Sequence, residues 1–215
     1  MTERRKLIEV AMPLEAINAA SARKVNPPRP PVDAAPLVGA PASGGVRAVL
    51  FCSLVDDPDD AEAPPDYIAA CREMPKGHHG EASDTPRARL FDFIEALVQW
   101  ENSNNEEILK TARKLMHFCT DGNPPPVYDP FAGGGSIALE AQRLGLEAHA
   151  SDLNPVAVLI NKAMIEIPPK FAGRPPVHPG QENDLMNREW RGAKGLAEDV
   201  RYYGEWMRQE AFRRA

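Results

Sequence analysis

The sequence predicts an α/β fold in which a doubly wound parallel sheet begins near the middle of the chain, preceded by a mainly helical region. Three observations predict it. A short apolar strand at 127–129 leads into the glycine turn 133–135, a helix pattern follows at once, and the same strand-then-helix order repeats from residue 146. Strands that alternate with helices through short loops are typical of parallel sheets. We therefore divide the chain into a helical region, residues 1–122, and a partial nucleotide-cofactor domain, residues 123–215.

The composition and net charge limit the classes of protein to which this chain can belong. The 215 residues carry a net charge of -6, so nucleic acid would have to bind at a local basic patch. The three cysteines have no metal-type spacing, and we expect each to be a buried or half-buried thiol. The charged start indicates no signal peptide, and no stretch reaches the roughly 20 apolar residues of a membrane span. We expect a soluble cytoplasmic protein that has no membrane partner and no metal site.

The first half of the chain predicts helices separated by loops. We expect a helix over 13–23 with Leu14 and Ile17 as its apolar edge, because Pro13 suits a first helical turn. Residues 25–45 are rich in Pro, Ala and Gly and predict an extended linker. The apolar run 46–55 predicts a buried helix, 56–66 an acidic loop, and 67–71 a short helical turn.

A helical hairpin is predicted to follow. Residues 87–100 place Leu90, Ile94, Leu97 and Val98 on one helix face. After a break at 102–104, Asn104 is expected to cap a second helix that ends near residues 121–122, with its apolar residues on one side. The pair His78-His79 has no third ligand at a helical spacing, so we interpret it as part of an exposed loop.

The strand-turn-helix at residues 127–144 carries the chemistry. The first strand ends on Asp129, the glycines of the turn permit positive φ angles, and Gly145 is expected to stop the helix. A second strand over 146–151 ends at Asp152, and Asn154 is placed to cap a further helix from Pro155. Near the end of the chain, a last helix is predicted from about residue 193.

Three ligands compete for this turn. A mononucleotide bound by a P-loop is excluded, because that motif needs a lysine and the turn contains none. A dinucleotide fingerprint fits loosely as Gly133-x-Gly135-x-x-Ala138. S-adenosylmethionine fits better: Asp129 can hold its ammonium group, the helix N-terminus its carboxylate, and Asp152 its ribose hydroxyls. Leu153 and the backbone near Asn154 would flank its adenine.

Two motifs add a family resemblance. Asp129-Pro130-Phe131-Ala132-Gly133-Gly134-Gly135-Ser136 resembles the cofactor motif of amino-group methyltransferases that act on nucleic acid. Together with the block 144–157 and the segment 7–18, it resembles the large adenine-specific DNA methylases whose N-terminal region is the domain of unknown function DUF1156.

This resemblance implies a Rossmann-like class I methyltransferase fold, S-adenosylmethionine as cofactor and DNA as partner. The methyl acceptor would be the exocyclic amine of a flipped adenine. No catalytic residue is assigned. The cofactor site would consist of Asp129, Phe131, Ala132, Gly133, Gly135, Asp152, Leu153 and Asn154.

The chain departs from the family in two places. The catalytic tetrad, Asp or Asn followed by Pro-Pro and an aromatic residue, is absent; Asn123-Pro124-Pro125-Pro126 lacks the aromatic and precedes the first strand, so we interpret it as a rigid entry loop. With two strands where this class of sheet has about six, we expect an N-terminal fragment that is inactive alone. Residues 25–45 replace a basic segment that contains Trp and Arg, as a local reading-frame displacement would, and translating the other forward frames tests that idea.

Other functions stay open at this point. An RNA guanine amino-group methyltransferase shares the glycine turn, although no RNA-binding module is visible. A non-catalytic remnant or DNA-binding accessory is consistent with the missing tetrad. A dinucleotide-dependent oxidoreductase is the least favoured.

Overall fold

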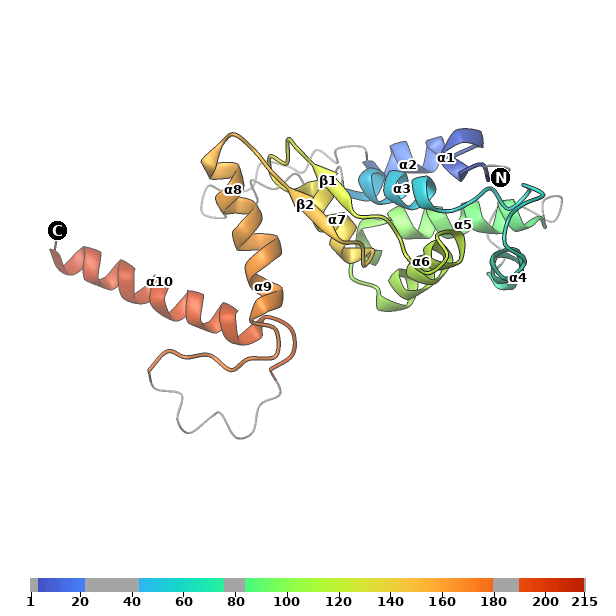
Figure 1. Cartoon of the computed structure of the whole chain (residues 1–215). Helices are drawn as coiled ribbons and strands as arrows, with labels where there is room; N and C mark the ends of the chain where they lie inside the picture. The colour runs from blue at the N-terminus through green and yellow to red at the C-terminus, as the bar shows by residue number, and fades with distance from the viewer. Residues whose placement is uncertain (1–3, 22–42, 76–83, 180–189, 215) are drawn as a thin grey trace. The chain divides into compact units, whose positions relative to one another are not determined.

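A computed structural model describes residues 4–21, 43–75, 84–179 and 190–214 (Figure 1). The chain forms two compact units, Met1–Leu153 and Asn154–Ala215, and each is described by itself. Most of the predicted linker and the pair His78-His79 lie outside the described residues. The first unit holds both the helical N-terminal region and the glycine turn.

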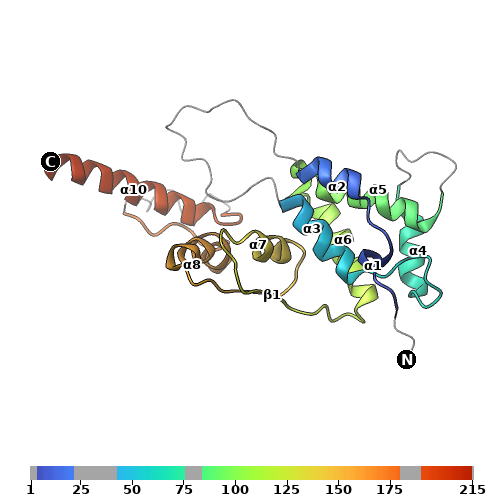
Figure 2. The same ribbon diagram turned by 90° about the horizontal axis from the view of Figure 1, so that it is seen from above.

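The helical part of the first unit is built around α3, Ser43–Leu54, which packs against α1, α2, α5, α6 and α7 (Figure 2). Its buried residues Ala48, Phe51 and Cys52, with Val55 directly after it, join a core to which all of these helices contribute. The apolar run predicted as a buried helix is therefore confirmed. The other helices of this part are α1 Leu7–Val10, α2 Leu14–Ser21, α4 Pro65–Glu73, α5 Pro86–Val98, a 3-10 turn Trp100–Asn102 and α6 Glu106–Cys119.

Several details of these helices differ from the prediction. The predicted linker is wrong for its last residues, because α3 already begins at Ser43 and a Cβ at Gly44 would overlap the carbonyl oxygen of Val98. Leu14, expected on the apolar edge of α2, is 59% exposed, whereas Ile17 is buried. The cap of α6 is Asn105 and not Asn104: its side chain accepts the N–H of Glu107 at 3.2 Å. The buried face predicted for α5 is confirmed.

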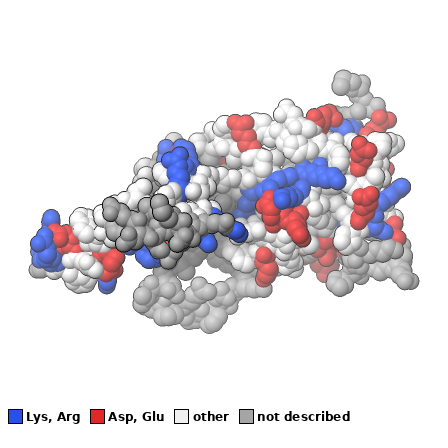
Figure 3. Space-filling view, turned by 90° about the horizontal axis from the view of Figure 1, so that it is seen from below, with Lys and Arg blue, Asp and Glu red and all other residues white. Residues whose placement is uncertain are grey.

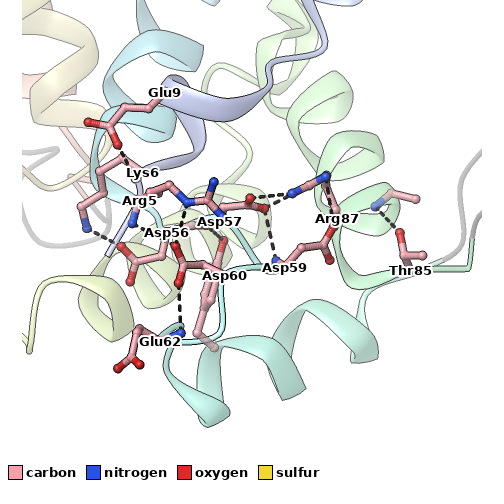
Figure 4. Close-up of polar contacts among 12 residues, drawn as sticks. Arg5, Lys6, Glu9, Asp56, Asp57, Asp59, Asp60, Glu62, Thr85 and Arg87 are labelled. Carbon is pink, nitrogen blue, oxygen red and sulfur yellow. Dashed lines mark hydrogen bonds and ion pairs between the residues drawn. The ribbon is translucent and has the colours of Figure 1, made fainter. Parts of the chain in front are cut away.

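The acidic loop predicted after α3 is present, and its first two acids are buried. Asp56 and Asp57 are fully buried and ion-paired (Figure 4). Lys6 Nζ lies 2.6 Å from Asp56 Oδ1, and Arg87 Nε donates to Asp57 Oδ1 at 3.0 Å. These carboxylates fasten the N-terminal segment and α5 to the end of α3, so they are structural residues.

All three cysteines are free and buried, as predicted. Burial raises the pKa of the Cys52, Cys71 and Cys119 thiols to about 12. Cys52 and Cys71 lie in α3 and α4, and Cys119 is the last residue of α6. Because the thiolate is the reactive form, these thiols are inert packing residues in the folded chain.

The sheet in the described residues has two strands, β1 Val127–Asp129 and β2 Ala148–Ala150, which pair in parallel with Val127 opposite Ala148. The parallel strand-helix-strand unit is confirmed, although β2 is shorter than predicted and a complete doubly wound sheet is not seen in the described part of the chain. Between the strands runs α7, Ser136–Arg143. Gly145 follows it with φ +75°, a backbone conformation that suits the predicted helix stop.

The second unit is helical in its described residues. It contains α8 Pro155–Asn161, a π-helical turn Lys162–Glu166, α9 Ile167–Lys170 and α10 Lys194–Arg214, the last of which confirms the predicted final helix. Asp199 on α10 accepts the backbone N–H groups of Val177 and His178, each at 2.9 Å, and the His178 ring stacks on Tyr202. The described helices include none that is both long and apolar enough to cross a bilayer.

Candidate functional site

The glycine turn joins β1 to α7. Gly133 and Gly135 have φ angles of +49° and +80°, values that residues with a Cβ rarely adopt. Gly135 closes the turn by donating its N–H to the Ala132 carbonyl at 2.7 Å. On the sheet side, Ala132 donates to the Ser151 carbonyl at 3.0 Å. The turn is therefore held against the loop that follows β2.

The two predicted acids lie at the carboxyl ends of paired strands, and each accepts a backbone N–H from the segment 131–133, where the chain enters the glycine turn. Asp129 ends β1, is 8% exposed, and accepts the Phe131 N–H at 3.1 Å. Asp152 follows β2, is half-buried, and accepts the Gly133 N–H at 2.8 Å. The sequence assigned both acids to one cofactor site. These hydrogen bonds, by which the acids also shape the turn, were not predicted.

The start of α7 is suited to an anionic group. Gly135 is the N-cap and supplies no side-chain cap. The first amides of a helix have no carbonyl partner within the helix, and the helix dipole adds a partial positive charge there. A carboxylate or phosphate can approach the backbone closely, because the three residues of the turn, Gly133, Gly134 and Gly135, have no Cβ.

The structure brings most of the predicted site residues together. Five of them lie in the first unit, within the turn or beside it: Asp129, Ala132, Gly133, Gly135 and Asp152. Ala132 is buried.

The two large apolar residues of the predicted site, Phe131 and Leu153, are 82% and 98% exposed. Asn154 begins the second unit, where its side chain accepts the Val156 N–H at 3.0 Å and caps α8 as predicted. A cofactor role for these residues stays a prediction.

A buried polar cluster next to the turn was missed by sequence reasoning. Arg47 of α3 and Glu140 of α7 are both fully buried, and Arg47 Nε lies 2.6 Å from Glu140 Oε2. Arg47 also donates to the Leu97 carbonyl at 2.6 Å and to Ser103 Oγ at 2.9 Å. The available signal was an arginine inside an otherwise apolar helix. Another was a glutamate beside Ala141 on the inward face of the helix 136–144.

Charges elsewhere in the first unit are mixed. Figure 3 shows a band of Lys and Arg side chains on the lower face, with Asp and Glu side chains beside it. Such a band is a local positive surface on a chain whose net charge is -6. Among the described residues, no group of three or more His, Cys, Asp or Glu side chains is arranged to hold a metal ion.

Comparison with known proteins shows a similarity for the part of the chain that contains this site. Residues 106–189 match the model of the family described as D12 class N6 adenine-specific DNA methyltransferase. The match covers less than half of the chain, but it contains α6, β1, the glycine turn, α7 and β2. This part of the chain is therefore similar to adenine-specific DNA methyltransferases, which are generally S-adenosylmethionine-dependent.

A second similarity is to the human (Homo sapiens) protein UMP-CMP kinase 2, mitochondrial, at 30% identity over 88 residues. The aligned region is 41% of this chain, and the chain spans 17% of the length of that kinase. No solved structure matches the chain.

Proposed function

We propose that the glycine turn binds S-adenosylmethionine and that the chain is the N-terminal, cofactor-binding part of a DNA methyltransferase that acts on the adenine amino group. The observation that carries the proposal is the placement of Asp129 and Asp152. They lie at the carboxyl ends of two adjacent parallel strands and accept backbone N–H groups of Phe131 and Gly133, close to the start of α7. Ligands of open α/β sheets bind outside the carboxyl ends of the strands.

The donor set fits the parts of S-adenosylmethionine. Its amino-acid carboxylate suits the amides at the start of α7, and its ammonium suits the carboxylate of Asp129. The carboxylate of Asp152 can accept hydrogen bonds from the two ribose hydroxyls. The exposed Phe131 and Leu153 side chains offer apolar surface for the adenine. When bound, the cofactor supplies an electrophilic methyl group on its sulfonium.

The acceptor base requires residues that these 215 residues do not include. An Asp- or Asn-Pro-Pro-aromatic tetrad occurs nowhere in the sequence. In the amino-group methyltransferases that the sequence resembles, this tetrad holds the amine and stacks on the base. We therefore propose that the chain alone binds the cofactor but transfers no methyl group, and that DNA is its partner in a longer protein.

The kinase similarity raises a competing ligand. A nucleotide kinase that uses a P-loop needs a lysine after the glycines to reach the phosphates. Here Ser136 and Ile137 follow Gly135, and no lysine lies between Asp129 and Asp152. A dinucleotide enzyme would use the same turn with Asp152 on a ribose, so these three ligands must be separated by measurement.

Isothermal titration calorimetry separates them. The chain is titrated in turn with S-adenosylmethionine, ATP and NAD under one set of conditions. We expect saturable heat with S-adenosylmethionine and at least about 10-fold weaker binding of ATP and NAD, since only the first ligand has an ammonium group for Asp129. Tighter binding of ATP would favour a nucleotide kinase, and tighter binding of NAD would favour an oxidoreductase. No heat with any of the three would favour a non-catalytic accessory.

A further inference from the structure

Among the described residues, a buried ion pair joins the helical N-terminal region to α7, the helix that begins at the glycine turn. Arg47 lies in the first half of α3, and Glu140 lies one helical turn into α7. The two side chains are fully buried, with Nε and Oε2 2.6 Å apart. Burial of a charged pair is costly, so its geometry must be well defined to persist.

The guanidinium of Arg47 joins more than these two helices. Its two terminal nitrogens donate to the Leu97 carbonyl near the end of α5 and to Ser103 Oγ before α6. The positive charge beside the last carbonyls of α5 is also favourable for the dipole of that helix. Arg143 of α7 bonds to the other Glu140 oxygen, so both carboxylate oxygens have partners. Arg47 thus fixes α7 to a rigid set of N-terminal elements.

Helix α7 transmits this constraint to the turn. The Leu139 N–H bonds to the Gly135 carbonyl at 2.9 Å, so the first turn of α7 is continuous from the N-cap to the neighbourhood of Glu140. The opposite side of the turn is fixed by the bond from Gly133 to Asp152 at 2.8 Å. The glycine turn is therefore held from the sheet by Asp152 and from the helices by the Arg47–Glu140 pair.

We infer that Arg47 and Glu140 are positioning residues for the cofactor turn: the N-terminal helical region sets the position of the α7 amides, and with it the affinity for the cofactor, through this pair. The inference rests on the proposed function for its consequence in affinity, but its structural part can be tested without ligand. It assigns to the N-terminal region a role in organising the cofactor site.

The test is hydrogen exchange of the whole chain, measured by mass spectrometry for wild type and Glu140→Gln. Glutamine keeps the shape of the side chain and removes its charge. We expect exchange in the peptide Ala132–Ile137 to rise at least about 10-fold more than exchange in Tyr67–Cys71 of α4, because a loss of overall stability alone would raise exchange in both peptides equally. Glu106→Gln is the matched control, because it removes a half-exposed partner of Arg113, and both peptides should exchange as in wild type.

If exchange in Glu140→Gln rises equally in both peptides, the pair contributes only to overall stability, and the inference is overturned. Unchanged exchange in Ala132–Ile137 would overturn it as well. If Glu140→Gln does not fold, Arg47→Lys is measured in the same way, because lysine keeps the charge but cannot make all three bonds of Arg47. The same result is expected, and the same outcomes overturn it.

Cofactor affinity provides the second measurement. The folded variant should bind S-adenosylmethionine about 10-fold more weakly than wild type, although the changed residue does not contact the ligand. If exchange in Ala132–Ile137 rises but the Kd for S-adenosylmethionine is unchanged, the pair does not influence cofactor affinity, and that part of the inference is overturned. If wild type itself shows no binding, the proposed function fails, and the exchange result alone decides the structural role of the pair.

Discussion

Replacement of Arg47 by methionine is expected to lower the free energy of unfolding of the first unit by about 3–5 kcal/mol. The substitution keeps an apolar stem but leaves Glu140 with Arg143 alone and removes the donors that reach the Leu97 carbonyl and Ser103. A buried carboxylate that loses its main partner, together with a buried carbonyl and hydroxyl that lose theirs, accounts for the size of the effect. Urea denaturation followed by circular dichroism measures it.

Two variants control this experiment. Arg5→Met removes a 63% exposed arginine that pairs with Asp60, and it should cost less than about 1 kcal/mol because exposed ion pairs contribute little. The double variant Arg47→Met/Glu140→Leu should recover part of the loss, since an apolar pair of similar volume removes the unpaired buried charge. An Arg47→Met midpoint equal to that of wild type would show that the pair does not support the fold.

The second large effect is expected on ligand binding. Asp152→Ala should weaken S-adenosylmethionine binding about 100-fold. The loss of two charge-assisted hydrogen bonds to ribose corresponds to about 3 kcal/mol, and the bond that orders Gly133 is lost as well. Calorimetric titration of the variant and of wild type measures the ratio of the dissociation constants.

The matched control for this variant is Glu147→Ala. Glu147 lies before β2, at the opposite end of the strand from Asp152, and its side chain is 71% exposed. It should bind like wild type. Asp152→Asn keeps one oxygen that can accept the Gly133 N–H, so its affinity should fall between wild type and Asp152→Ala. Equal affinities for Asp152→Ala and wild type would remove Asp152 from the site.

The sequence predicts local structure well where the signal is local. The face of α5, the order of β1, α7 and β2, and the cap at Asn154 all follow from periodicity and turn chemistry over a few residues. The cap of α6 is displaced by one residue because Asn104 and Asn105 are equally good candidates for it. Which of the two caps the helix depends on where the 3-10 turn before it ends.

The sequence predicts long-range polar contacts poorly. Asp56 and Asp57 belong to an acidic run, and they are buried in ion pairs with side chains from distant segments, among them Lys6 and Arg87. Arg47 and Glu140 are 93 residues apart, and a single sequence does not show that two inward charges meet. The apolar pattern of residues 136–144 also predicts that Ile137 faces inward, but Ile137 is 36% exposed, because Ala138, Glu140 and Ala141 form the buried face of α7.

The central claim is that the glycine turn binds S-adenosylmethionine, and photo-cross-linking localises the ligand most directly. The chain is irradiated with radiolabelled S-adenosylmethionine and digested with trypsin, and the labelled peptides are sequenced. We predict label in Leu115–Arg143, which contains the turn, or in Leu144–Lys162, which contains Asp152, and its loss in the presence of excess unlabelled ligand. Label confined to other peptides, or label that unlabelled ligand does not displace, would contradict the claim.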